Sequence, residues 1–277
     1  MAKPVWSGVP RGFPMKSRLF VLLLAIACVA VPAAPRAADW PRATEAVRAG
    51  TAADVVDGDT LVLETGIQVR LVGLQAPKLP LGRGGFAKWP LADEAKAALE
   101  SLTLGKALTL SYGGQRIDRH GRLLAHLTDG SGRWVQGAML EAGMARVYSF
   151  ADNRARIAEM LERERAARAA RRGIWAHPFY AVRTPEEAGR HIGSFQIVEG
   201  RVLSAAVVRQ RGYLNFGPDW KTDFTVTIAP RDARRFRAAG VDIAALGGRS
   251  VRVRGWLRRY NGPTIEATHP EQIELLP

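Results

Sequence analysis

The stretch from Val55 to Leu79 reads VVDGDTLVLETGIQVRLVGLQAPKL and carries the clearest structural signals of the chain. Apolar runs occupy residues 61–63 and 67–74, and Thr65-Gly66 separates them. Two apolar runs joined by a short glycine-containing segment are typical of a β-hairpin. The stretch therefore predicts two antiparallel strands near the start of a β-rich domain.

Charged side chains accompany this apolar hairpin. Asp57 and Asp59 flank a glycine in the turn that precedes the first strand, and Arg70 lies inside the second strand. A guanidinium cannot be neutralised by losing a proton, so Arg70 must meet an anionic ligand or a carboxylate. Asp57 or Glu94 could supply that carboxylate, in which case Arg70 would form a structural ion pair. The two aspartates could equally cap local backbone groups of their turn.

A second motif, DRHGR at residues 118–122, opens another apolar strand at residues 123–127 and carries Arg122. The Asp-Gly-Asp-Thr turn, the Arg-Leu strand that ends in a proline, and this Asp-x-x-Gly-Arg turn together resemble the staphylococcal nuclease (thermonuclease) family. The resemblance covers residues 49–175 and keeps the order of the motifs. It implies an OB-type five-stranded barrel with three helices packed around it.

The resemblance also implies roles for individual residues. Asp59 stands at a metal-ligand position, with Asp57 beside it. Arg70 and Arg122 stand where the family stabilises the phosphate and the negative charge of the transition state. Tyr148 matches an aromatic residue that lines the nucleotide pocket. A surface charge in a turn is the simpler alternative for Arg122.

Two positions depart from the family pattern. The family Asp that binds calcium corresponds to Gln75, and the Glu that activates water corresponds to Lys78. These changes make the site about three charge units more positive, which disfavours a calcium ion because hard cations prefer carboxylates. We therefore expect Arg70, Lys78 and Arg122 to form a cationic pocket that binds phosphate. Hydrolysis should be lost or reduced, and no cofactor is certain.

Residues 1–38 resemble a secretory signal. Arg11, Lys16 and Arg18 precede an apolar run at residues 19–31, which is too short for a comfortable membrane span, and small residues and prolines follow. We expect cleavage between Ala33 and Ala38, and Met15 is an alternative start. The expected location is secreted or periplasmic, with no stable membrane span after removal of the signal.

The charge and cysteine content limit the function classes. The chain has 40 Lys and Arg, 26 Asp and Glu, and one cysteine, Cys28, which falls inside the predicted signal. Residues 39–277 retain 35 basic and 26 acidic residues, a net charge of +9. They have no disulfide or thiolate metal site. A basic chain favours polyanionic partners such as DNA or RNA, although a basic surface can also serve solubility.

The resemblance implies a nuclease-like domain at residues 39–176. Prolines and an acidic pair mark residues 177–190 as a linker, and the strand pattern predicts a second small OB-like β-barrel at residues 191–277. In the first domain we expect further elements as follows: helices at residues 91–104, 134–141 and 153–172, and strands at residues 106–112 and 146–148, with the first strand starting near Gly50. In the second we expect strands at residues 196–208, 213–216, 224–228 and 250–257, and a helix at residues 231–239. The overall class is α+β, mostly β.

The last of these strands places Arg252, Arg254 and Trp256 on one face. Arginines beside a stackable ring suit single-stranded nucleic acid, but an outward polar face is also ordinary strand chemistry. Arg83, in a glycine-rich loop beside the expected site, is a further candidate for nucleic-acid binding.

Three functions remain open from the sequence. The first is an exported, nuclease-like protein that binds nucleic acid through a basic pocket. The second is an active, divalent-metal-dependent phosphodiesterase that recruits a substitute carboxylate such as Asp93 or Glu94. The third is a cell-envelope interaction module with a basic surface. The sequence leaves the oligomeric state and the choice between DNA and RNA undetermined.

Overall fold

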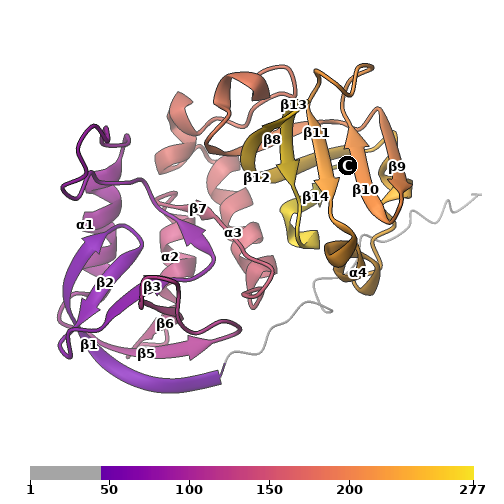
Figure 1. Ribbon diagram of the computed structural model, residues 1–277. Coiled ribbons are helices and arrows are strands. Elements are labelled where there is room, and N and C mark those ends of the chain that lie inside the picture. The colour runs from indigo at the N-terminus through magenta and orange to yellow at the C-terminus, as the bar shows by residue number, and fades with distance from the viewer. Residues whose placement is uncertain (1–44) are drawn as a thin grey trace, which may run out of the picture. The chain divides into compact units, whose positions relative to one another are not determined.

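The computed structural model describes residues 45–277, with side chains from residue 50 onward. The predicted signal, its cleavage region and Cys28 lie outside the described residues. In the described part, two β-rich regions follow each other along the chain (Figure 1). Each has its own hydrophobic core, one drawn from residues 52–161 and the other from residues 188–267. The exact domain boundaries stay predictions.

The first region is a closed five-stranded barrel with the strand order β1-β2-β3-β6-β5. Its elements are β1 (Glu45–Asp57), β2 (Thr60–Leu63), β3 (Gln68–Leu71), β5 (Ala107–Tyr112), β6 (Leu123–Asp129), α1 (Ala92–Thr103), α2 (Val135–Glu141) and α3 (Ile157–Ala169). Strand β1 pairs with both β2 and β5. Register shifts in both ladders bend β1, which lets it close the barrel between these two strands. The predicted barrel and its three helices are confirmed.

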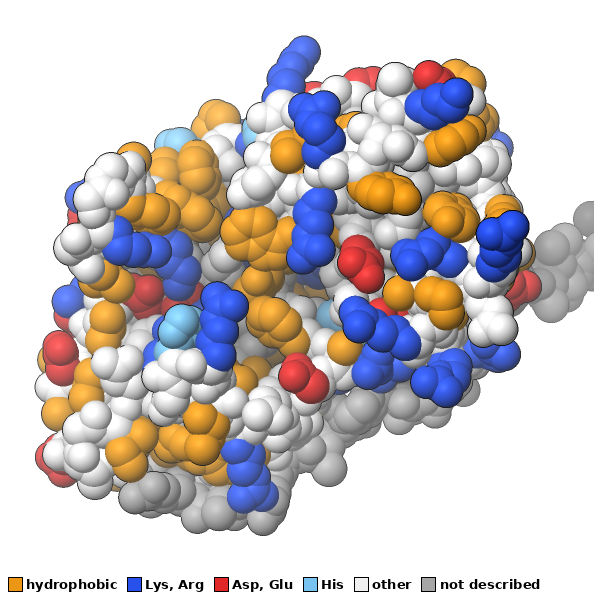
Figure 2. Space-filling view, in the orientation of Figure 1, with side chains coloured by type: hydrophobic (Ala, Val, Ile, Leu, Met, Phe, Trp, Pro, Cys, Tyr) orange, Lys and Arg blue, Asp and Glu red, His pale blue; other side chains and the backbone are white. Residues whose placement is uncertain are grey.

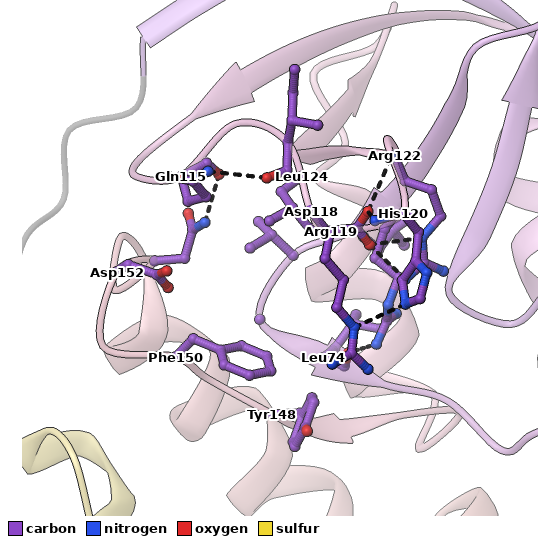
Figure 3. Close-up of a pocket in the computed structure, with 16 residues that line it drawn as sticks. Leu74, Gln115, Asp118, Arg119, His120, Arg122, Leu124, Tyr148, Phe150 and Asp152 are labelled. Carbon is purple, nitrogen blue, oxygen red and sulfur yellow. Dashed lines mark hydrogen bonds and ion pairs between the residues drawn. The ribbon is translucent and has the colours of Figure 1, made fainter.

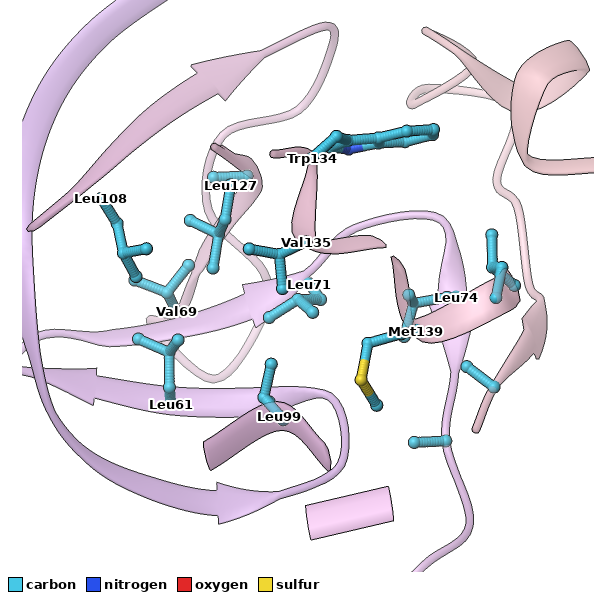
Figure 4. Packing of buried hydrophobic residues seen from close by; sticks show 14 of the residues in the cluster. Leu61, Val69, Leu71, Leu74, Leu99, Leu108, Leu127, Trp134, Val135 and Met139 are labelled. Carbon is cyan, nitrogen blue, oxygen red and sulfur yellow. The ribbon is translucent and has the colours of Figure 1, made fainter. Parts of the chain in front are cut away.

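Alternating apolar residues fill this barrel. In β5 the side chains of Leu108 and Leu110 point inward, whereas their neighbours are exposed. They meet Leu61 and Val69 of the predicted hairpin and Leu99 of α1, and all five are at most 1% exposed. Figure 4 shows Leu61, Val69, Leu99 and Leu108 converging between the strands and the helices. The period-two pattern of the sequence thus builds the core that holds the Asp57–Asp59 turn in place.

The second predicted hairpin strand, at residues 67–74, ends earlier than expected. Gly73 has φ +84°, and a Cβ there would lie 2.8 Å from Met160 Sδ of α3. The chain turns at this glycine and continues as β4 (Leu74–Gln75), which pairs with β7 (Arg146–Val147) in a separate two-stranded sheet. This turn carries Gln75 away from the barrel strands.

Helix α3 also begins later than the predicted residue 153. The side chain of Asn153 donates a hydrogen bond to the carbonyl of Gln115 at 2.7 Å, which holds the chain in an extended link to the preceding strands. Arg156, with φ 61°, then precedes the first helical residue. A tertiary hydrogen bond therefore overrides the local helical pattern over these residues.

The second region, where a small OB-like β-barrel was predicted, is a curled seven-stranded sheet. Its elements are β8 (Phe195–Arg201), β9 (Ser204–Val208), β10 (Arg211–Asn215), β11 (Thr225–Ile228), α4 (Pro230–Ala238), β12 (Ser250–Tyr260), β13 (Gly262–Glu266) and β14 (Ile273–Leu275). The predicted strand at residues 196–208 is two strands. The N–H of Val202 donates to Arg249 and that of Leu203 to Asn215, so the chain changes pairing partners between them.

Residues 177–190, predicted as a linker, contain two short 3-10 turns, Pro178–Tyr180 and Ala188–His191, the second of which ends one residue beyond the range. Tyr180 is 3% exposed, and its hydroxyl donates to the carbonyl of Pro90 at 2.7 Å. The segment therefore packs against the start of α1. Over residues 45–277, no helix is long and apolar enough to cross a membrane.

Two buried histidines predict how stability depends on pH. Burial, together with nearby arginine charges, lowers the pKa of His126 and of His269 from 6.5 to about 3. The unfolded chain therefore takes up protons first as the pH falls below 6.5, and the folded state loses stability down to about pH 3. Between pH 7 and pH 5 each histidine should cost about 2 kcal/mol.

Urea unfolding at several pH values measures this loss. His269→Gln should flatten the profile between pH 7 and pH 5, whereas the matched change His120→Gln, at an exposed position, should leave it unchanged. An unaltered profile in His269→Gln would contradict the burial of that imidazole.

Candidate functional site

The site is built on the turn between β1 and β2. Asp57 is 4% exposed and Asp59 is fully buried. A Cβ on Gly58 would lie 2.7 Å from Ala76 Cβ and 2.8 Å from Ala95 Cβ, so only glycine lets the β4 segment and α1 approach the turn this closely. The local sequence thus places two carboxylates next to each other in the interior, where each needs a cationic partner.

Arg70 is the first of these partners. Arg70 Nη1 lies 2.6 Å from Asp59 Oδ1. The same guanidinium donates hydrogen bonds to the backbone carbonyls of Asp59 and Leu74 at 3.3 and 3.0 Å. The sequence predicts either an anionic ligand or an ion pair for this arginine. The structure has an ion pair, and its partner is Asp59 rather than Asp57 or Glu94. Arg70 still lines the neighbouring cavity.

Lys78 is the second partner. Its Nζ lies 2.5 Å from Asp59 Oδ2 and 3.2 Å from Asp57 Oδ2. Burial alone would raise the pKa of Asp59, but the charges of Arg70 and Lys78 outweigh it and hold that pKa well below its usual range. Burial and the negative charge of Asp59 raise the pKa of Asp57, against which the charge of Lys78 acts. The four groups form one closed ion cluster.

This cluster corrects the expected electrostatics of the site. From the sequence, Arg70, Lys78 and Arg122 were expected to form a joint cationic pocket for phosphate. Two of the three cations instead neutralise Asp57 and Asp59, because buried carboxylates recruit the nearest positive groups. Lys78 is not among the residues that line the cavity. The positive charge available to a ligand is therefore smaller than predicted.

Gln75 also faces a different partner. Its Oε1 accepts hydrogen bonds from Nε and Nη2 of Arg146 at 3.0 and 2.8 Å. Arg146 is 4% exposed, and burial lowers its pKa to about 10. The guanidinium lies 4.7 Å from the ring centroid of Phe195. The amide oxygen that could have served a metal is thus used to satisfy a buried arginine.

The residues present do not fit a calcium ion at this place. Calcium takes six to eight oxygen ligands with several carboxylates, whereas Asp57 and Asp59 share the ammonium of Lys78 and Gln75 binds Arg146. Within the described part of the chain, no group of three or more His, Cys, Asp or Glu residues could hold a metal ion. Asp93, a suggested substitute ligand, pairs instead with the exposed Lys88.

A cavity of about 610 Å³ adjoins the cluster. Figure 3 shows Tyr148 and Phe150 on one side of it and the loop of residues 118–122 on the other. The lining residues that carry polar or aromatic groups are Arg70, Gln115, Asp118, Arg119, His120, Arg122, Tyr148, Phe150, Asp152 and Asn153. The cavity thus offers stackable rings facing a basic loop.

Arg122 is positioned by its own loop. Its Nη2 lies 2.7 Å from Asp118 Oδ2, its Nε donates to the same oxygen at 2.8 Å, and its Nη1 lies 3.5 Å from Thr60 Oγ1. Backbone and side-chain hydrogen bonds hold the pKa of Asp118 low against a desolvation that raises it. The side chain of Arg122 is 27% exposed, so part of the guanidinium faces the cavity.

Sequence reasoning placed Arg70, Arg122 and Tyr148 at this cavity and missed several others. Phe150 stands two residues after Tyr148, and Arg119 lies inside the DRHGR motif already singled out, so both signals were available. Gln115 and Asp152 lay in unremarkable loops. Gln115 and Asp152 line the cavity only because of the course of their loops, and no local sequence pattern predicts that course.

The other predicted nucleic-acid residues lie in varied settings. Arg83 is exposed, donates to the carbonyls of Leu79 and Pro80, and stacks on Phe86 with 4.0 Å between its Cζ and the ring centroid. Arg252 is 13% exposed and lies 2.5 Å from Glu199. Neither of them lines the described cavity.

Arg254 requires a correction, because its side chain is 1% exposed and cannot meet a nucleic acid. Its Nη1 donates to Glu164 Oε2 of α3 at 3.0 Å and to the carbonyl of Val147 at 3.2 Å. Its Nη2 lies 2.9 Å from Glu164 Oε1 and 2.5 Å from Glu274 Oε1. The predicted outward face of β12 is therefore covered at this residue by the barrel region.

Trp256, by contrast, is 45% exposed, and its indole Nε1 donates to the hydroxyl of Tyr148 at 2.8 Å. Two further contacts join the same segment to the second sheet: Ser149 Oγ lies 2.7 Å from His269 Nε2, and Arg154 lies 2.6 Å from Glu271. The aromatic side of the cavity is thus held by residues more than 100 positions away in sequence.

Comparisons with known proteins agree with this geometry. Residues 68–177 match the family model described as staphylococcal nuclease homologue. A micrococcal nuclease from Shigella flexneri is 31% identical over 176 residues, which cover 59% of this chain and 90% of that protein. Protein ParB from Escherichia coli is 30% identical over 175 residues, covering 59% and 89%. An uncharacterized 38.1 kDa protein from Capnoides sempervirens is 32% identical over 115 residues, covering 42% of this chain and only 30% of that relative.

Proposed function

Because this chain belongs to the staphylococcal nuclease family, we propose that it binds nucleic acid in the cavity beside Arg70 and Arg122 and does not cut it by a calcium-dependent route. The observation that carries the proposal is the ammonium of Lys78, 2.5 Å from Asp59 and 3.2 Å from Asp57. The lysine ammonium at this position neutralises part of the negative charge of the two carboxylates, a role that a divalent cation would otherwise fill.

The proposal also rests on the group that should activate water. An ammonium that donates to two carboxylates has no free electron pair with which to take a proton from water. Without a metal and without a base, only the positioning of the phosphate remains. Arg122 supplies charge-assisted hydrogen bonds for that, and Arg119 adds positive charge on the same side of the cavity.

Base recognition is the second part of binding. Tyr148 and Phe150 lie edge to face with 4.8 Å between their ring centroids, and both line the cavity. An exposed ring next to a basic loop offers stacking to one base and ion pairing to its phosphate. Lysine and arginine side chains are numerous on the face shown in Figure 2, with hydrophobic side chains between them. Such a surface favours a polyanion.

Export completes the proposal. It rests on the signal-like pattern of residues 1–38, a basic start followed by an apolar run and small residues. Mass spectrometry of protein recovered from the periplasm and the medium would reveal a new N-terminus between residues 33 and 39 if the signal is removed there. An intact N-terminus in the cytoplasmic fraction would contradict export.

One assay on purified protein tests the function. Labelled single-stranded and double-stranded DNA and RNA are titrated with the protein in calcium or in chelator, with anisotropy reporting binding and gels reporting cleavage. We expect binding that persists in chelator and weakens as salt rises, with no calcium-dependent product. Cleavage that requires calcium and disappears with Arg122→Gln would overturn the proposal, as would the absence of binding.

Arg122→Gln should weaken binding by about 10-fold to 100-fold, because one charge-assisted contact to phosphate is lost. The matched control is Arg237→Gln, an exposed arginine on α4, which packs on β10. The control should leave the affinity unchanged within about twofold, since it removes the same charge at a distance. Equal losses in both variants would mean that Arg122 acts only through the net charge of the protein.

A further inference from the structure

The aromatic side of the cavity continues onto the second sheet. Tyr148 lines the cavity, and its hydroxyl accepts the hydrogen bond from the indole of Trp256. The ring of Tyr148 also lies edge to face with Phe195 of β8, with 4.8 Å between the centroids. Trp256 stands opposite Phe195 in the β8–β12 pair. The exposed indole is therefore the next ring outward from the cavity.

From Trp256 the strand β12 runs on to Tyr260 with its alternate side chains in solvent. Trp256 is 45% exposed, the side chain of Arg258 is 73% exposed, and Tyr260 is 72% exposed. Leu257, which points to the other face, is fully buried. Alternate residues of a strand share a face and lie about 7 Å apart. We call these three side chains the β12 row.

The charged member of the row has only a weak partner within the protein. The contact of Arg258 with Glu266 is long, at 3.9 Å, and the arginine is 73% exposed and the glutamate 34% exposed, so the pair contributes little. Exposed Trp and Tyr side chains that flank an arginine are costly to leave in water and match the chemistry of a nucleotide chain. The strand register thus presents ring, cation and ring in a line that begins at the cavity.

We propose that the β12 row binds a single-stranded segment of nucleic acid that continues from the nucleotide held in the cavity. This inference rests on the proposed function and extends it to a substrate class, unpaired DNA or RNA. Trp256 and Tyr260 lie about 14 Å apart along the strand, so the two rings stack on exposed bases that are separated by an intervening nucleotide, and Arg258 neutralises a phosphate between them. In a duplex the bases already stack on each other, so the rings have no free base face to meet.

The test compares short and long ligands. Labelled phosphorylated dinucleotides and oligonucleotides of 4, 8 and 12 nucleotides are titrated in chelator, and duplexes of the same lengths are run beside them. In the wild type, affinity for single strands should rise with length and exceed affinity for the matched duplex. Tyr260→Ala should weaken octamer binding about 10-fold, because a stacking ring is lost, and should leave dinucleotide binding unchanged.

Variants at two further positions, Trp256 and Arg258, make the test specific. Trp256→Phe keeps a ring but loses the hydrogen bond to Tyr148, so it should retain most of the octamer affinity, whereas Trp256→Ala should not. Arg258→Gln should lower the salt dependence of octamer binding by about one ion. The matched change Arg237→Gln on α4 should alter neither the affinity for the octamer nor the salt dependence of octamer binding.

The outcomes separate the two proposals. If neither the dinucleotide nor the octamer binds, the proposed function fails and this inference fails with it. If the dinucleotide binds but longer strands gain nothing, or Tyr260→Ala leaves the octamer unaffected, only the inference is overturned. Duplexes that bind as tightly as single strands, and lose affinity equally in Tyr260→Ala, would also overturn it, because the row would not then require unpaired bases.

Discussion

Replacing Lys78 with glutamate is expected to raise the affinity of the protein for calcium by at least about 100-fold. The change removes the ammonium that lies against Asp57 and Asp59 and adds a third carboxylate. At ~4 Å and an effective dielectric constant of ~20, each pair of unit charges is worth roughly 4 kcal/mol. Even after a large allowance for desolvation, a change of two units beside a divalent ion should dominate.

Isothermal titration calorimetry measures this affinity directly, and calcium-dependent melting confirms that the ion binds the folded state. Without calcium, Lys78→Glu should melt below the wild type, because three carboxylates then repel one another. Calcium should restore stability in the variant and leave the wild type unchanged.

Control variants separate charge from ligand supply. Lys78→Met removes the cation without adding an oxygen and should gain less affinity than Lys78→Glu, while Lys78→Arg should gain none. Adding Gln75→Asp to Lys78→Glu supplies another carboxylate, but the buried guanidinium of Arg146 competes for it. We therefore expect the double variant to bind calcium well, with most of the gain coming from position 78. If neither Lys78→Glu nor the double variant binds calcium more tightly than the wild type, the calcium site of the family does not correspond to these residues.

Arg254→Met is expected to lower the free energy of unfolding by about 3–5 kcal/mol. Methionine replaces the aliphatic stem of the arginine but lacks the guanidinium, so the fully buried Glu164 and the 9% exposed Glu274 would lose their shared cation. Glu164 would keep Arg168 and the N–H of Val147 as partners. Breaking one side of a buried ion pair costs far more than the pair contributes when intact, because a desolvated charge remains.

Urea unfolding at pH 7 measures this loss, and Arg252→Met provides the matched control on the same face of β12. Arg252 pairs closely with the 40% exposed Glu199 and lies 3.9 Å from Glu274, which keeps Arg254 in this variant, so the removal of Arg252 should cost about 1 kcal/mol or less. Adding Glu164→Gln to Arg254→Met should recover part of the stability, since it removes the charge left without Arg254. Equal effects of the two arginine variants would contradict the burial of Arg254.

The motifs of the sequence predicted the barrel and the core of its site well. Apolar alternation over residues 61–71 and 108–112 gives the inward faces, and these faces fix where the Asp57–Asp59 turn lies. Arg70 is on the strand that the pattern predicted, next to the turn. These features depend on contacts between neighbouring strands, so the local pattern of apolar residues is enough to predict them.

The pattern of apolar residues does not predict which partners the charged residues bind. The sequence suggested that Arg252, Arg254 and Trp256 share a face, which the strand register supports, but the three side chains differ in exposure at 13%, 1% and 45%. The difference arises because α3 and the Val147 segment cover the middle of that face. Likewise, only the folded chain shows that Lys78 reaches both aspartates.

The amino-acid sequence by itself determined the family, the barrel and the residues at the heart of the site, because these follow from side-chain type and spacing along the chain. Only the tertiary structure decided which charges neutralise each other, that Gln75 serves Arg146, and that Trp256 joins Tyr148. Ion pairs depend on distance and on exclusion of water, and both are set by residues far apart in the chain.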